Sequence, residues 1–517
     1  MTFEFVFVLL SLLGMVAALI ADKMRPGMIL FSVVVLFLCA GILTPKEMLE
    51  GFSNKGMITV ALLFLVSEGI RQSGTLGQVI KKLLPQGKTT VFKAQLRILP
   101  SVAFISAFLN NTPVVVIFAP IIKHWAKSVN LPATKFLIPL SYVTILGGIC
   151  TLIGTSTNLV VHGMILEAGF EGFSMFELGK VGIFIAIAGI IYIFLFSKRL
   201  LPDARPDTAV PDEEVEEGEK LHRVEAVLGA RFPGINKKLK DFNFQRHYGA
   251  EVKEIKTRNG QRFVSNLEEV VLHEGDTLVV MADDTFIPTW GESSVFVLLT
   301  NGNEPDTTGK KKRWFALLLL VLMIVGATVG ELPITKEMFP DIKLDMFFFV
   351  SITTIIMAWT NLFPARKYTK YISWDILITI ACAFAISKAM VNSGVADSVA
   401  KFIIGLSDDY GPHVLLAMVF IITNLFTELI TNNAAAALAF PLALSISAQL
   451  GVSPTPFFVV ICMAASASFS TPIGYQTNLI VQGIGNYKFT DFVRIGLPLN
   501  IITFLISIIL IPLIWNF

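Results

Sequence analysis

Long apolar segments alternate with short polar ones along most of the chain. Ten of them are long enough to cross about 30 Å of hydrocarbon as helices. They lie at 4–20, 26–43, 56–72, 136–166, 180–198, 314–330, 346–363, 372–391, 457–482 and 494–516. The pattern predicts a polytopic membrane protein that is all-α within the membrane and is surrounded by lipid.

Two further apolar segments, 98–122 and 413–448, are interrupted at their centres by short polar side chains. The first carries Asn110-Asn111-Thr112-Pro113 and the second carries Thr431-Asn432-Asn433. Non-helical polar backbone at membrane depth is tolerated only where protein or a cavity surrounds it. Each segment is therefore predicted to be a re-entrant helical hairpin with its tip inside the protein.

The two halves of the chain repeat each other. Residues 52–74 match 372–394 at an offset of 320, and 154–159 match 474–479 at the same offset. Each repeat has five predicted spans, an odd number, so the two repeats must insert with opposite orientation. Inverted repeats with paired broken helices are the architecture of secondary transporters, whose binding site lies between the repeats near the bilayer midplane.

A charged segment separates the two repeats. Residues 203–313 hold 37 of the 80 charged residues. We therefore divide the chain into membrane repeat 1, an acidic linker, a small α/β domain, a basic linker and membrane repeat 2, at 1–200, 201–218, 219–298, 299–313 and 314–517. Within the small domain, the pattern predicts strands near 221–228, 248–256 and 272–281, a turn at 258–260, and a turn followed by a helix start from 232.

Composition excludes several other classes of protein. The chain is 54% hydrophobic and only 15% charged, whereas a soluble protein carries about a quarter charged residues. A soluble enzyme, a disordered chain and a basic nucleic-acid binder are therefore excluded. The four cysteines lie in apolar segments without metal-ligand spacing, and no catalytic motif of a membrane enzyme appears.

Lysine and arginine are distributed unequally between the two sides of the predicted topology. With the N-terminus outside, the inner loops hold 22 of them and the outer loops hold seven. Cytoplasmic loops of inner-membrane proteins carry such an excess. Both termini are predicted to be extracytoplasmic in the plasma (inner) membrane, and the inserted domain is predicted to be cytoplasmic.

The broken elements suggest ion binding. A helix that begins at a break directs unpaired N–H groups and a positive dipole toward an anion. Unwound carbonyls and the side-chain oxygens of Asn and Thr suit a hard cation such as Na⁺. Glycines at 154 and 474 permit unwound backbone, and Asn158 and Asn478 supply further oxygens near them.

At these residues the sequence resembles the divalent anion/sodium symporter family. The resemblance covers about 400 residues of both membrane halves. The family's Ser-Asn-Thr hairpin signatures appear as 110–112 and 431–433, and its second motif pair appears as 154–158 and 474–478. It implies an elevator-type homodimer that moves a divalent anion with Na⁺. The string Thr471-Pro-Ile-Gly-Tyr-Gln-Thr-Asn478 together with the large insert is similar to the sulfate-permease branch.

Carried over by position, the resemblance implies two Na⁺ sites and one anion site. The first Na⁺ site would use Ser106, Asn110, Asn111 and Gly154. The second would use Thr427, the backbone of Ile430, Asn432 and Gly474. The anion would contact Asn111, Thr112, Asn432, Asn433, Tyr475 and Gln476. The second motif lacks the family's two prolines, which would stand at 476 and 477, and carries Tyr475-Gln476 in place of Thr-Pro; both changes bear on dicarboxylate specificity.

Residues 219–298 resemble the C-terminal domain of regulators of potassium conductance, the TrkA-C type. Such domains dimerise and bind a small ligand, in some cases a cyclic dinucleotide. A purely structural role in dimerisation stays equally open.

The expected function is therefore Na⁺-coupled symport of a divalent anion, with sulfate favoured. A dicarboxylate symporter or exchanger is the alternative within the class. A ligand-gated channel is the alternative outside it, although no selectivity-filter string of the Thr-Val-Gly-Tyr-Gly kind occurs.

Overall fold

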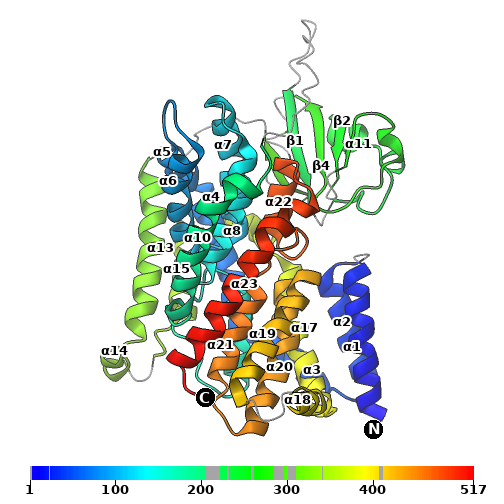
Figure 1. The fold of residues 1–517 in the computed structure, drawn as a ribbon, viewed down its shortest axis with the longest axis vertical. Coiled ribbons are helices and arrows are strands. Elements are labelled where there is room, and N and C mark those ends of the chain that lie inside the picture. Colours follow the sequence, from blue (N-terminus) through cyan, green and yellow to red (C-terminus); the bar gives the residue numbers. More distant parts are fainter. Residues whose placement is uncertain are drawn as a thin grey trace, which may run out of the picture.

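The computed structural model shows a helical body with a small sheet inserted mid-chain (Figure 1). The structure describes residues 3–21, 24–203, 222–229, 232–257, 261–283, 295–300, 310–339, 342–406 and 411–517, together with Phe286 and Trp290. The predicted turn at 258–260 and the predicted acidic linker beyond Asp203 lie outside the described residues.

The described residues of the first half form ten α-helices. Their bounds are α1 Phe3–Ala21, α2 Pro26–Cys39, α3 Pro45–Glu50, α4 Lys55–Gln72, α5 Thr75–Leu83, α6 Val91–Ser106, α7 Asn111–Ser128, α8 Leu137–Gly148, α9 Ser156–Glu167 and α10 Gly179–Leu200, with 3-10 turns η1 Gly51–Ser53 and η2 Ala133–Lys135.

The second half repeats this order. Its bounds are α13 Lys310–Gly330, α14 Pro333–Met338, α15 Met346–Trp359, η5 Ala365–Lys367, α16 Tyr368–Tyr371, α17 Trp374–Asn392, α18 Val395–Leu406, α19 Gly411–Leu429, α20 Asn432–Leu450, α21 Thr455–Ser466, α22 Gln476–Gly485 and α23 Phe489–Ile514. Each helix from α4 to α10 therefore has an equivalent from α17 to α23.

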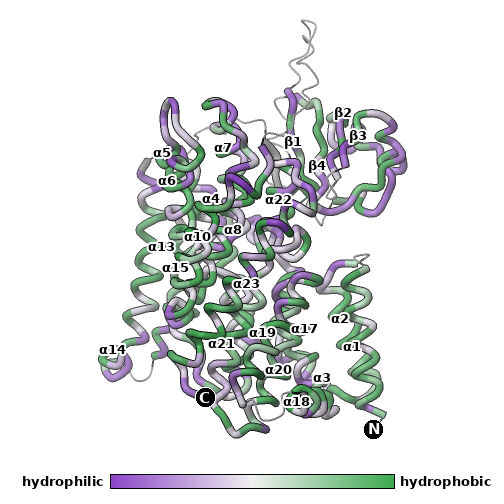
Figure 2. The backbone as a smooth tube through the Cα atoms, viewed as in Figure 1, coloured by the Kyte–Doolittle hydropathy of each residue, from purple (hydrophilic) through white to green (hydrophobic). Residues whose placement is uncertain are grey.

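The helices are apolar enough for a membrane. Among the described residues, eight helical segments have the length and hydropathy to cross one. Figure 2 shows hydrophobic positions along the long helices and hydrophilic ones in the connecting loops and on the inserted sheet. Exposed aliphatic side chains such as Ile187, Leu195, Ile509 and Leu513 point outward from α10 and α23, as expected of helices that face lipid.

Two predicted spans are not continuous helices. Segment 136–166 is divided into α8 and α9 by an irregular stretch at 149–155, and 457–482 is divided into α21 and α22 at 467–475. The hydropathy pattern continues through both breaks, because apolar side chains flank the polar ones. In each predicted hairpin two helices meet at the polar interruption, and these helices, α6–α7 and α19–α20, extend past the expected bounds at both ends.

The first helices of each half pack against the other half. Helix α2 packs on α17, and α15 packs on α4. The N–H of Gly27 donates to Asp375 Oδ1 at 3.2 Å, and Lys55 at the start of α4 forms an ion pair with Asp345 before α15. These two equivalent pairs give the protein a pseudo-twofold arrangement.

The insert is a five-stranded antiparallel sheet of order β3-β2-β4-β1-β5. Its strands are β1 His222–Leu228, β2 Glu251–Lys256, β3 Arg262–Phe263, β4 Thr277–Ala282 and β5 Phe296–Thr300. The described residues of the insert also include the short helix α11, Phe244–Tyr248, and the 3-10 turns η3 Leu239–Asp241 and η4 Leu267–Glu269. The helix start expected after 232 is a turn, because Pro233 and Gly234 interrupt it.

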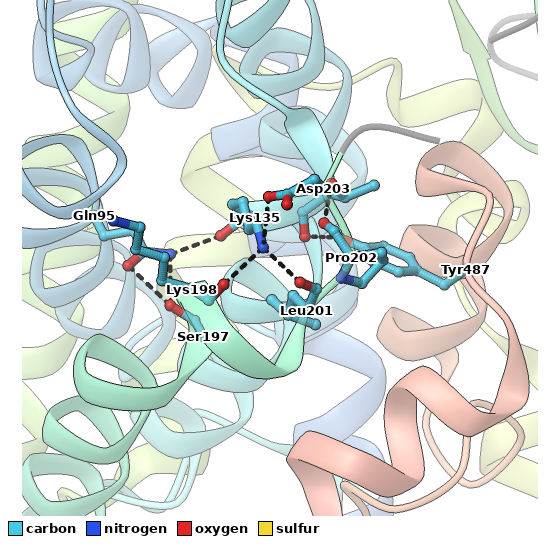
Figure 3. Close-up of polar contacts among 9 residues, drawn as sticks. Gln95, Lys135, Ser197, Lys198, Leu201, Pro202, Asp203 and Tyr487 are labelled. Atoms are coloured by element: carbon cyan, nitrogen blue, oxygen red, sulfur yellow. Dashed lines mark hydrogen bonds and ion pairs between the residues drawn. The ribbon is translucent and has the colours of Figure 1, made fainter. Parts of the chain in front are cut away.

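Lys135, in the turn before α8, is buried and holds the end of α10 (Figure 3). Its ammonium donates to the carbonyl oxygens of Lys198 and Leu201 at 2.8 and 2.5 Å and lies 3.1 Å from Asp203 Oδ1. The last carbonyls of a helix have no partner within it, and the helix dipole there favours a cation. The contact therefore ends α10 where the chain leaves the membrane.

Gln95 of α6 and Tyr487 before α23 complete this cluster. Gln95 donates to the Lys135 carbonyl at 2.7 Å and to Ser197 Oγ at 3.1 Å. The Tyr487 hydroxyl donates to the Thr134 carbonyl at 2.5 Å. Helices α6, α8, α10 and α23 are thereby joined at one end of the bundle.

We expect Lys135→Met to lower the free energy of unfolding in detergent by about 2–4 kcal/mol, because it removes charge-assisted bonds to two buried carbonyls. Thermal unfolding measured by fluorescence checks this. Lys127→Met, which changes an exposed lysine on α7, is the control. Equal midpoints for the two variants would contradict the assigned role of Lys135.

Candidate functional site

Four helices begin at the breaks and tips near the centre of the protein. They are α7 at Asn111, α9 at Ser156, α20 at Asn432 and α22 at Gln476. Helix α7 packs on α22, and α20 packs on α9, so each hairpin of one repeat contacts the broken helix of the other. The first N–H groups of a helix lack intrahelical partners. Four sets of such donors are therefore available around one region.

The Tyr475 hydroxyl lies between the two hairpin tips. Asn111 Nδ2 donates to it at 2.6 Å, Thr155 Oγ1 lies 3.1 Å away, and Asn432 also hydrogen-bonds it. Beside this contact, Thr112 Oγ1 donates to Gln476 Oε1 at 3.2 Å. These bonds join the first hairpin to the second repeat's break through neutral side chains.

The second hairpin makes the corresponding contact with the first repeat. Asn433 Oδ1 accepts hydrogen bonds from Ser156 Oγ at 3.3 Å and from Thr157 Oγ1 at 3.2 Å. The structure thus brings together all six residues that the sequence suggested for an anion. Thr155, Ser156 and Thr157 belong to the motif at 154–158 but were not assigned to the anion, although their equivalents in the second repeat are Tyr475, Gln476 and Thr477.

Each hairpin has the same internal hydrogen bond. Ser106 Oγ donates to Asn111 Oδ1 at 2.8 Å, and Thr427 Oγ1 donates to Asn432 Oδ1 at 2.8 Å. Asn110 and Ile430 lie at the two tips, where Asn110 precedes α7 without a side-chain capping bond and Ile430 is buried. The residues suggested for each cation are therefore neighbours.

The two breaks also repeat each other. The N–H of Gly154 donates to Thr151 Oγ1 at 3.2 Å, and the N–H of Gly474 donates to Thr471 Oγ1 at 3.3 Å. A Cβ on Gly154 would lie 2.4 Å from the Gly148 carbonyl oxygen. Only glycine permits this approach, and a Cβ on Gly148 would itself lie 2.7 Å from Asn111 Oδ1. Thr151 and Thr471 were not singled out, although the 320-residue offset relates them.

Asn158 and Asn478 differ in one respect. Asn158 Nδ2 donates to the Thr151 carbonyl at 2.9 Å, and Asn478 Nδ2 donates to the Thr471 carbonyl at 3.2 Å. Asn478 Oδ1 accepts from Ser141 at 2.7 Å, whereas the fully buried Asn158 Oδ1 has no hydrogen-bond partner among the residues that the structure describes. An unpaired buried amide oxygen is costly, so a cation at the first site would satisfy an existing acceptor.

The oxygen ligands in this region are amides, hydroxyls and carbonyls. Such neutral oxygens suit Na⁺. In the described part of the chain, no group of three or more His, Cys, Asp or Glu could hold a metal ion.

Glu428, at the second tip, is bound by the break of its own repeat. Its carboxylate accepts from the backbone N–H groups of Ser470 and Thr471, each at 2.9 Å, and from Asn500 Nδ2 at 2.7 Å. The equivalent position in the first hairpin is Ala107. Glu428 therefore fixes the second tip to segment 467–475 by charge-assisted bonds that the first tip lacks.

We expect Glu428→Gln to lower the free energy of unfolding by about 2–4 kcal/mol. The carboxylate accepts hydrogen bonds from two backbone N–H groups, whereas the NH₂ of a glutamine amide cannot accept them. Solute uptake should fall with it, since segment 467–475 carries Gly474 and Tyr475. Glu337→Gln, an exposed change on α14, is the matched control. Unfolding and uptake equal to those of the control would show that the contact is dispensable.

Comparisons with known proteins agree with the geometry. A family model described as citrate transporter matches residues 16–445 and 342–516. An uncharacterized transporter of Synechocystis is 30% identical over 94% of this chain and 93% of that protein. A probable sodium/sulfate cotransporter of Chlamydomonas reinhardtii is 23% identical over 93% of this chain and 85% of that protein.

Among solved structures, the YdaH transporter of Alcanivorax borkumensis is similar in fold. The TM-score is 0.53 at 12% sequence identity, over 90% of this chain and 86% of that one. At this identity the likeness concerns the fold alone.

Proposed function

Because the chain belongs to the citrate transporter family and is a secondary transporter, not an enzyme, we propose that it moves a divalent oxyanion, sulfate, together with Na⁺. The observation that carries the proposal is the cluster around Tyr475, where both hairpin tips and both breaks meet in neutral hydrogen-bonding groups. An anion there is held by helix N-termini, hydroxyls and amides.

Two cations beside the anion balance its charge. The first set is Ser106, Asn110, Asn111, Gly154 and Asn158, and the second is Thr427, Ile430, Asn432, Gly474 and Asn478. Asn111 and Asn432 each belong to a cation set and also reach Tyr475. Coupling follows from this sharing, because a cation that orders these two side chains also orders the donors for the anion.

The convergence of hydrogen-bonding groups on the Tyr475 hydroxyl supports a compact anion over an elongated dicarboxylate. The Tyr475 side chain is 8% exposed, and its hydroxyl already spans from Asn111 to Thr155. A tetrahedral anion needs donors converging on one point, which this arrangement offers. A succinate-like molecule needs two such points separated by a carbon chain. The name of the Chlamydomonas relative agrees with sulfate.

Orientation, assembly and regulation complete the proposal. The excess of lysine and arginine in the loops supports extracytoplasmic termini and a cytoplasmic insert in the inner membrane. The elevator motion and the homodimer rest on the resemblance to the symporter family. A small-ligand regulator of the inserted domain rests on the resemblance of 219–298 to TrkA-C domains. Cysteine labelling at Cys39 and at an engineered C-terminal cysteine, from either side of a vesicle, tests the orientation.

The decisive experiment is uptake into proteoliposomes. Labelled sulfate and labelled succinate are supplied with and without an inward Na⁺ gradient. We expect Na⁺-dependent, saturable sulfate uptake and little succinate uptake. Succinate uptake without sulfate uptake would show that the substrate is a dicarboxylate. A requirement for a proton gradient would show that H⁺ is the coupling ion in place of Na⁺. Single-channel currents in a planar bilayer would indicate the channel alternative, and uptake of neither anion would overturn the proposal.

A further inference from the structure

The inserted sheet docks on the membrane helices through one face. Residues of β1 alternate, so Val224 and Ala226 lie in the core of the insert while Val227 packs with the hydrophobic core of the membrane helices. On the neighbouring strand, Thr277 lies against Gly483 of α22, and Gly275 lies against Leu479. Figure 1 shows the sheet beside α22 at one end of the bundle.

An ion triad completes the interface. Glu225 of β1 lies 3.0 Å from Lys123 of α7 and 3.5 Å from Lys256 of β2. Burial alone would raise the pKa of Glu225, but the two lysines outweigh it and lower the pKa to about 2. The lowered pKa means that this contribution to docking is fully present at neutral pH and is lost as the pH falls from 4.5, the ordinary pKa, through about 2.

The docked helices are the ones that carry the candidate site. Helix α7 begins at Asn111 and continues to Lys123, and α22 begins at Gln476 and continues to Gly483. The insert therefore contacts the far ends of both helices.

The equivalent surface in the first repeat is occupied differently. Gly163 of α9 packs directly on α4, where a Cβ on Gly56 would lie 2.9 Å from Gly163 Cα. The offset of 320 relates Gly163 to Gly483 and Gly56 to Ile376 of α17. Yet α22 has no comparable packing against α17 in the part of the chain that the structure describes. Its glycine faces the insert instead.

This difference concerns how the central bundle, α6–α10 with α19–α23, packs against the outer helices α2, α4, α15 and α17. The outer pairs themselves are alike, because α2 packs on α17 as α15 packs on α4. Among the described residues, α9 therefore packs on α4, whereas α22 does not pack on α17, although α20 does. In an inverted-repeat transporter the opposite state is expected to exchange the two arrangements, which brings the start of α17 to Gly483.

We propose that the docked insert is a lock, which holds the transporter open toward the insert by covering the surface of α22 that α17 must reach. The proposal rests on the transport function given above. Each cycle then requires the contacts at Lys123, Glu225 and Thr277 to open. Whatever binds or dimerises the inserted domain would act on transport by stabilising or releasing this docking.

A disulfide across the interface tests the lock. A Cβ on Gly483 lies 3.8 Å from Thr277 Cβ, which is the mean separation in disulfides. Oxidised Thr277→Cys/Gly483→Cys should lose sulfate uptake, and a reductant should restore it. Each single-cysteine variant should be unaffected by oxidation. If the oxidised double variant transports at the rate of the reduced one, the lock is refuted while the transport function stands.

A distance measurement tests the lock without any substrate. Spin labels are placed on α17 and beside α22, at Trp374→Cys and Lys488→Cys, in a Cys39→Ser background. We expect one long distance in the parent protein. Lys123→Glu, which opposes Glu225 with a like charge, should add a shorter-distance population. Lys127→Glu, on the same helix and exposed, should add none. Identical distance distributions in all three proteins would overturn the lock even if no anion were transported.

Discussion

Asn111→Ala and Asn432→Ala should each reduce Na⁺-dependent sulfate uptake by about 100-fold or more while leaving a folded protein. Each asparagine accepts a hydrogen bond from its own hairpin and reaches Tyr475 of the second break. Removing it takes away a contact to a cation and a donor for the anion, and contacts to charged groups are worth about 3 kcal/mol. Uptake into proteoliposomes and binding of Na⁺ by calorimetry measure both losses.

Asn130→Gly is the matched control for these variants. Asn130 lies on the surface just after α7 and has a φ of 55°, so glycine fits its backbone. Its uptake should equal that of the parent. If Asn111→Ala and Asn432→Ala both retain the control's uptake and Na⁺ dependence, the assigned site is wrong. Loss of uptake together with aggregation on a sizing column would instead show that the asparagines hold the fold.

Tyr475→Ala should change which anion is transported. Removing the phenol removes the hydroxyl that Asn111, Thr155 and Asn432 share and opens space between the tips. Sulfate uptake should fall by about tenfold or more, equivalent to about 1.4 kcal/mol, while succinate uptake should appear. The KM for each anion separates a loss of affinity from a loss of rate.

Tyr475→Phe separates the two roles of this side chain. It keeps the ring and its volume but removes the hydroxyl, so sulfate uptake should weaken without any gain in succinate uptake. An unchanged sulfate KM in both variants, with no succinate uptake, would mean that Tyr475 neither binds nor selects the anion.

Much of the architecture could be predicted because it depends on patterns along the chain. The hairpins were visible as polar interruptions at 110–112 and 431–433, and the 320-residue offset exposed the repeats. The same offset placed Gly154 and Gly474 at equivalent breaks. These residues could be predicted from the local sequence, because a polar residue or a glycine inside an apolar segment stands out.

The remaining features depend on contacts that no local pattern reports. Thr151 looks like an ordinary helix residue until the Ala107 carbonyl is placed beside it, and the motif at 154–158 does not show that Thr155 lies against Tyr475. The length of each break was underestimated because its flanking side chains are apolar. The docking of the insert could not be foreseen either, since Lys123 and Glu225 lie 102 positions apart in different domains.

The bond between Asn111 and Tyr475 joins residues 364 positions apart. During synthesis, the polar tip of the first hairpin can therefore contact Tyr475 only after most of the chain has been translated. Translation proceeds at about 5–20 residues per second, so this delay lasts tens of seconds. A half-made chain holds an exposed polar tip throughout that time, which makes the nascent first repeat the stage most vulnerable to chaperone capture and quality-control proteolysis.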